Sequence, residues 1–152
     1  MGDREELLSR AEETRRNLLA SVEGLTDEQM TKPAVGDWSI KDLLAHVASW
    51  DEMALPDIQR IARGDAPALA TFDLKRVDEY NAMIMSLRRH FSLEQARREL
   101  DISRMSLLEA IGRLPDSALA EGQFPRGMLQ ICAYHDVEHT EDIQLWRKRE
   151  GL

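Results

Sequence analysis

The chain has 152 residues, 43% hydrophobic and 32% charged, which is the balance of one soluble globular domain covering residues 1–152. Its 28 acidic and 20 basic residues give a formal net charge of -8, and no basic stripe offsets the surplus, so nucleic acid is excluded as the main partner. No apolar run reaches the roughly 18 residues that span a bilayer, which excludes a membrane partner and favours a cytoplasmic protein.

The first helix is predicted from about residue 3 to residue 23, where apolar side chains recur every three or four positions. Gly24 ends it. Thr26 and Gln29 match a capping box, in which two side chains satisfy free amides at a helix start, and they predict a short turn. Residues 33–36 predict a loop. No segment alternates as a strand would, and β-branched residues are few.

The second long helix has a well-defined predicted start. Ser39 can cap it with Asp42 reaching back, and Trp38 can pack on Leu43 from just outside the helix. Pro56 is expected to kink or end this helix, with apolar spacing resuming before position 64. The register places four side chains on one shared face: Asp42, His46, Trp50 and Met53.

Three further helices complete the prediction. One runs from about residue 77 to 90, and the next is opened by a capping box of Ser92 and Gln95 and extends to about 114. A polar, glycine-containing connection over residues 116–127 leads to the last helix, from about 128 to 150. Four long helices and one shorter one indicate an all-α fold: a four-helix bundle with one additional short helix.

Three histidines fall on core-facing positions of two predicted helices. His135 and His139 are four residues apart, which places both imidazoles on one face of the last helix, and His46 can approach them from the second long helix. Neutral imidazoles suit a divalent transition metal such as zinc or nickel, and three of them leave positions open for water or substrate. The pattern predicts a metal site of His46, His135 and His139, with ordinary half-buried histidines as the alternative.

Three carboxylates lie close to these histidines in the sequence. Asp142 and Asp42 could each accept a hydrogen bond from a ligand imidazole, although Asp42 also has a capping role. Glu138 completes the pattern HDVEH, which matches the inverted zincin motif of peptidases. Those enzymes take an acidic ligand from well downstream, and only 13 residues follow His139, so we interpret Glu138 as a solvated side chain or as a carboxylate that hydrogen-bonds to a ligand imidazole.

The single cysteine, Cys132, excludes an intramolecular disulfide and a cysteine zinc cluster, and it indicates a reducing compartment. It lies one turn before His135 and could be a fourth ligand or a nucleophile, but a small buried core residue is the simpler interpretation. His90 is expected at the surface of a helix junction. Trp50 and Trp146 are expected in the bundle core, where their rings could also wall a pocket.

Two motifs resemble those of a known superfamily. The segments GDWSIKDLLAHVASWDE and AYHDVEHTEDIQLWR are similar to the second helix and the C-terminal metal-binding helix of the DinB/YfiT-like superfamily. The segment DEYNAMI resembles the ClbS/DfsB-like branch, and the mycothiol-dependent isomerases form another candidate branch. The resemblance implies a four-helix bundle, often a homodimer, that holds zinc or nickel with three histidines, which map onto His46, His135 and His139.

The resemblance implies two classes of function. Some relatives use bacillithiol, mycothiol or glutathione as a co-substrate, so the first class is a metal-dependent thiol transferase, isomerase or hydrolase acting on a small electrophile in stress or detoxification. The alternative is a non-catalytic metal-binding stress-response protein. The sequence contains no recognisable thiol-binding motif, and it assigns neither catalytic residues nor a substrate.

Overall fold

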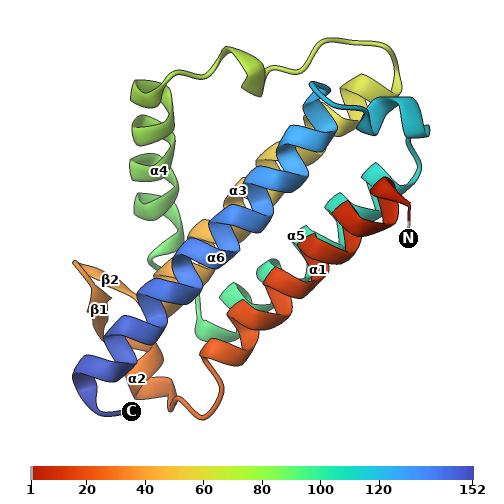
Figure 1. Cartoon of the computed structure of the whole chain (residues 1–152). Coiled ribbons are helices and arrows are strands. Elements are labelled where there is room, and N and C mark those ends of the chain that lie inside the picture. Colours follow the sequence, from red (N-terminus) through yellow and green to blue (C-terminus); the bar gives the residue numbers. More distant parts are fainter. Residues whose placement is uncertain (1) are drawn as a thin grey trace.

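Helices make up most of residues 2–152, the part of the chain that the computed structural model describes (Figure 1). Their bounds are α1 Asp3–Ser21, α2 Asp27–Thr31, α3 Ile40–Ala62, α4 Leu74–Arg88, α5 Leu93–Gly112 and α6 Phe124–Glu150. The remaining regular elements described are β1 Pro33–Val35, β2 Trp38–Ser39 and two single-turn 3-10 helices, Leu69–Thr71 and Asp116–Leu119. The predicted all-α class is confirmed.

The four long helices α1, α3, α5 and α6 form a bundle, as predicted. Helix α3 packs along α5, α1 packs along α6, and α3 also contacts α6. Figure 1 shows these helices running in parallel or antiparallel directions, while the shorter α4 stands apart from them and joins the bundle through α3. Within the described residues, no helix combines the length and the apolar character that a membrane crossing requires.

Side-chain caps fix helix starts where the sequence predicts them. The Ser39 hydroxyl accepts a hydrogen bond from the Asp42 amide at 3.1 Å, and the Asp42 carboxylate accepts one from the Ser39 amide at 3.0 Å. Thr26 and Gln29 form the same reciprocal pair at the start of α2. At the start of α5 the Ser92 hydroxyl accepts from the Gln95 amide, but the Gln95 side chain does not return the bond, so only half of the predicted capping box forms. Because the Ser39 cap fixes where α3 begins, it also fixes the place of His46 along that helix.

A short hairpin between α2 and α3 corrects the prediction that residues 33–36 are a loop and that the chain has no strand. β1 and β2 pair antiparallel through Pro33 with Ser39 and Val35 with Trp38. Gly36 makes the turn at φ 59°, a left-handed conformation that glycine adopts without strain. Strands of three and two residues are too short to show alternation, which is why the sequence pattern gave no sign of them.

Two helix boundaries also differ from the prediction. Helix α3 continues through Pro56 to Ala62 without an end near Leu55. Ala54 and Ile58 are fully buried on either side of the proline, so packing holds the helix where one backbone hydrogen bond is missing. Helix α6 begins at Phe124 instead of near residue 128, because Pro125 is tolerated in the first turn, where its missing amide has no helical partner.

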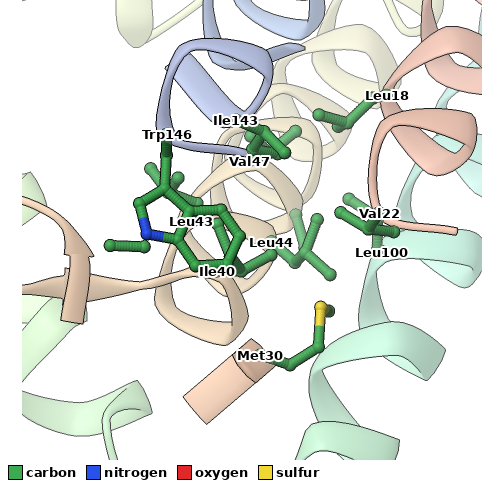
Figure 2. Packing of buried hydrophobic residues seen from close by; sticks show 12 residues of the cluster. Leu18, Val22, Met30, Ile40, Leu43, Leu44, Val47, Leu100, Ile143 and Trp146 are labelled. Carbon is green, nitrogen blue, oxygen red and sulfur yellow. The ribbon is translucent and has the colours of Figure 1, made fainter. Parts of the chain in front are cut away.

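The apolar core is divided into two clusters, one towards each end of the bundle. Figure 2 shows the first, in which Trp146 of α6 and Met30 of α2 pack around the start of α3. The first cluster contains Leu18, Val22, Met30, Ala34, Ile40, Leu43, Leu44, Val47, Ala48, Leu100, Ile143 and Trp146. The second contains Ala11, Ala54, Ile58, Leu107, Ile111, Leu114, Leu119, Met128, Leu129 and Cys132. The layer between them carries the polar side chains described next.

Candidate metal site

The fold brings together the three histidines that the sequence singled out. His46 comes from α3, and His135 and His139 lie one turn apart on α6, which contacts α3. The Nε2 atom of His135 lies 2.9 Å from Nε2 of His46 and 3.0 Å from Nε2 of His139. One ligand atom from each residue lies within 4.8 Å of the others, a geometry that could hold a metal ion.

Burial keeps two of the three imidazoles neutral. His46 is 4% exposed, and desolvation, followed by the charge of His139, lowers its pKa from 6.5 to about 3. Desolvation lowers the pKa of His135 to about 2, with smaller contributions from the charges of His139 and His46 and from Arg15 and Arg104. A neutral imidazole has a free lone pair, which is the state that binds metals.

A cation would satisfy this cluster better than hydrogen bonds do. The Nδ1 atom of His139 lies 3.0 Å from the Asp142 carboxylate, so a proton on this nitrogen can be donated to Asp142 and the Nε2 lone pair then faces His135. Nε2 of His135 can carry at most one proton, yet it faces Nε2 of both His139 and His46. With one proton on each imidazole, the two contacts of His135 cannot both be hydrogen bonds. A metal ion could instead accept the lone pairs of all three Nε2 atoms.

Two neighbouring side chains hold the histidines in place. Asp142 orients His139 through the contact described above, as the sequence suggested it could. The ring centroid of Trp38 lies 4.9 Å from that of His46, at an interplanar angle of 57°, so the hairpin covers the histidine on α3. The Nδ1 atom of His46 is buried without a hydrogen-bond partner among the described residues.

The structure separates the other candidates from this cluster. Cys132 is 3% exposed in the second core cluster, where burial, followed by the charge of Asp51, raises its pKa well above the usual value. Glu138 and His90 are exposed, as expected. One Asp42 oxygen is used by the helix cap, and the other is buried without a hydrogen-bond partner in the described chain.

The two tryptophans expected in the core have different surroundings. Trp146 is 5% exposed in the first core cluster, as expected. Trp50 is half-buried, and its indole N–H donates to the Asn81 side chain on α4 at 2.9 Å. Its ring also lies edge-on to that of Tyr80, with centroids 4.9 Å apart. Trp50 therefore joins α4 to α3 instead of filling the bundle core.

Sequence reasoning missed a buried cluster of four charges beside the histidines. Each bundle helix contributes one residue: Arg15 from α1, Asp51 from α3, Arg104 from α5 and Asp136 from α6. Every arginine pairs with both aspartates at 2.9–3.0 Å, and the side chains are at most 7% exposed. Burial alone would lower the pKa of Arg104. The negative charges of Asp51 and Asp136 have the larger combined effect and raise this pKa.

This Arg–Asp quartet has nearly all its hydrogen-bonding groups occupied. Arg15 also donates to the Leu100 carbonyl at 2.9 Å, and Arg104 donates to the Ala11 carbonyl at 2.7 Å. Thr14 donates its hydroxyl to Asp136 at 3.1 Å. Buried charges are tolerated when they are paired in this way, and the quartet fixes the four helices against one another in the layer that holds the histidines.

Comparison with known proteins identifies the fold and the family. The family model of the DinB superfamily matches residues 10–143, a span that includes all three histidines. The structure is similar to a crystal structure of an uncharacterised protein from Escherichia coli UTI89, with a TM-score of 0.84, 14% identity, and coverage of 98% of this chain and 95% of that chain. No curated protein matches the chain.

A second solved structure, of a protein from Streptococcus pneumoniae, gives a TM-score of 0.76 with 17% identity, covering 97% of this chain and 92% of that chain. At such low identity both structures support the fold alone.

Proposed function

Because the chain belongs to the DinB superfamily, we propose that it binds one divalent transition metal, zinc or nickel, through His46, His135 and His139. The single observation that carries this proposal is the convergence of three Nε2 atoms, with His135 within 3.0 Å of both partners. Two of these imidazoles are held neutral by burial. The ligand set contains only nitrogen, because Cys132 lies in the second core cluster.

The proposed activity is metal-dependent transfer of a low-molecular-weight thiol to a small electrophile, or a related isomerisation or hydrolysis. A divalent ion supplies, when bound, Lewis-acid chemistry that brings the pKa of a thiol or a water molecule near neutrality. Three protein ligands leave room for such a group. The protein directs the Nε2 lone pairs of the three histidines at the metal. Asp142 orients His139, and Trp38 packs against His46.

The alternative is a metal-binding stress-response protein without catalytic activity. It is favoured by the burial of His46 and His139, which are 4% and 9% exposed. His135 is half-buried and is the most exposed of the three histidines, which favours the catalytic function. A rate that depends on both metal and thiol would distinguish the two functions.

We also propose that the protein forms a homodimer. Helix α6 exposes three large apolar side chains, Ile131, Tyr134 and Leu145, at 59–68%. Exposed apolar side chains gathered on one element are a common feature of protein interfaces. Sedimentation velocity should give twice the chain mass, whereas a monomer at micromolar concentration would contradict this part of the proposal.

Metal content tests the proposed ligands directly. Untagged protein, purified with zinc or nickel and then dialysed, should retain about one ion per chain, as measured by mass spectrometry of the metal. His139→Ala should lose most of this ion and keep its helical circular dichroism, because the apolar core supplies the folding energy. His90→Ala is the matched control, since this histidine is exposed and outside the cluster. Equal metal content in both variants would overturn the ligand assignment.

A further inference from the structure

A hollow of about 700 Å³ lies between the hairpin and α4. Its walls are Trp38 of β2 and four residues of α4: Ala82, Met85, Ser86 and Arg89. The volume is within the range of about 300–1,000 Å³ that is usual for small-molecule sites. The Trp38 ring that lines the hollow also lies against His46, so the hollow and the histidine cluster share one wall.

Three of the lining residues of α4, Ala82, Ser86 and Arg89, are exposed, and Met85 is buried beside them. Their spacing of three and four positions places them on one side of the helix. The residues that attach α4 to α3 lie elsewhere on it: Tyr80 donates its hydroxyl to the Ser49 carbonyl at 2.9 Å, and Asn81 accepts from Trp50. Helix α4 therefore acts as a fixed wall whose remaining face is available to a ligand.

The hollow combines an apolar floor with a cation. Trp38 is half-buried, so the exposed part of its ring can pack against an apolar group, and Met85, 4% exposed, closes the floor beside it. Arg88 pairs with Glu52, but within residues 2–152 Arg89 has no carboxylate at ion-pair distance. The Lys41 ammonium group donates to the backbone carbonyl of Arg89 at 2.7 Å and so helps to hold the end of α4.

Other polar groups near the cation leave it available. Lys41 lies 3.9 Å from the Asp42 carboxylate, so these two charges offset each other. The Ser86 hydroxyl donates to the Met83 carbonyl at 2.7 Å, which leaves its oxygen free to accept a hydrogen bond from a ligand. In a chain with a net charge of -8, an unpaired guanidinium in a hollow is a specific feature for binding an anion.

We infer that this hollow binds the substrate of the neighbouring histidine site, and that the substrate is a small organic carboxylate with an apolar body. Its carboxylate pairs with Arg89, and its apolar part packs on the Trp38 ring, which also contacts His46. A planar guanidinium can donate two parallel hydrogen bonds to a carboxylate, which selects this group over a neutral amide. The claim that the bound molecule is a substrate rests on the proposed function. The claim that the hollow binds a carboxylate does not, because none of the proposed metal ligands lines the hollow.

Binding of two matched probes to the metal-free, full-length protein tests the inference. The probes are 3-phenylpropanoate and its neutral analogue 3-phenylpropanamide, titrated by calorimetry at low ionic strength. The carboxylate should bind about tenfold more tightly than the amide, which is the usual effect of one charge-assisted pair. Arg89→Gln should remove this preference, and Arg89→Lys should keep part of it. Ala82→Trp should block both probes by filling the hollow.

Arg113→Gln is the matched control, because it makes the same charge change at an exposed position at the end of α5. It should leave the preference for the carboxylate intact. Equal affinities for the two probes, no binding of either, or the same loss in the Arg89 and Arg113 variants would overturn the inference. A protein that binds no metal but discriminates between the probes would overturn the proposed function alone. A protein that binds the metal but does not discriminate between the probes would overturn only this inference.

Discussion

His135 and Asp136 are neighbours on α6, but their side chains belong to two different buried clusters. The His135 imidazole lies 2.9 Å from His46 in the histidine cluster. The Asp136 carboxylate accepts hydrogen bonds from Arg15 and Arg104 at 3.0 and 2.9 Å. One turn of α6 therefore carries both a candidate metal ligand and a carboxylate that connects α6 to α1 and α5, so the Arg–Asp quartet and the candidate metal site are joined through adjacent residues.

Asp136→Asn should destabilise the protein by about 3–5 kcal/mol, because it leaves the two buried arginines with one carboxylate. Chemical denaturation of the metal-free protein measures this loss. The matched control is Asp116→Asn, which removes the exposed partner of Arg4 and should cost about 0–1 kcal/mol. Similar free energies of unfolding for the two variants would show that the quartet is not the ionic centre of the bundle.

The metal-free protein should lose stability as the pH falls below about 6.5. The folded state keeps the pKa of His46 at about 3 and that of His135 at about 2, whereas the unfolded chain binds protons at ordinary histidine values near 6.5. Protons therefore favour unfolding, by up to about 1.4 kcal/mol per pH unit for each histidine. Urea midpoints between pH 7.5 and 5.5, where carboxylates remain ionised, measure the effect. His46→Gln should show a shallower pH dependence, and His90→Gln should match the wild type.

Trp38→Ala should lower the free energy of unfolding by about 1–3 kcal/mol, through loss of a half-buried ring, without removing a metal ligand. The expected result is a lower melting temperature with about one zinc retained per chain at 20 °C. Trp38→Phe should recover part of the stability, because it restores an aromatic contact with His46. An unchanged melting temperature in Trp38→Ala would contradict the packing of the hairpin on α3.

Catalysis, if the proposed function is correct, should depend on His46 and not on Cys132. The wild type, His46→Ala and Cys132→Ser are compared with a panel of cellular thiols and small electrophiles. We expect a metal-dependent rate in the wild type and in Cys132→Ser, because the cysteine is buried and its pKa is raised. Activity lost only in Cys132→Ser would make the protein's own thiol the nucleophile. No metal-dependent rate in any combination would leave the ion-binding alternative.

The sequence predicts those features that depend on local spacing. The helices follow from apolar periodicity, and the start of α3 follows from Ser39 and Asp42, which meet within four residues of chain. The pairing of His135 with His139 is equally local, since a helix places positions i and i+4 together. His46 lies on the apolar face of α3, which the sequence pattern reveals, so its approach to the other two histidines could also be predicted.

The sequence does not predict contacts that depend on how one helix is placed against another. The pairs of the Arg–Asp quartet are separated by 32 to 121 residues, and a shift of one turn between two helices would break them. One signal was present: Arg15 and Arg104 each interrupt an apolar stripe, Arg15 between Ala11 and Leu18. A charge on the core face of a helix must find a partner or solvent, so it indicates an ionic layer without naming its members.

X-ray absorption spectroscopy of the zinc-loaded, untagged protein measures the proposed ligand set itself. We expect three imidazole nitrogens at about 2.0–2.1 Å from zinc with one light oxygen scatterer, and one fewer imidazole in His139→Ala. A sulfur scatterer at about 2.3 Å should appear only after a thiol is added. A sulfur neighbour before any thiol is added, or a zinc ion bound without three imidazoles, would contradict the assignment of His46, His135 and His139 as the metal site.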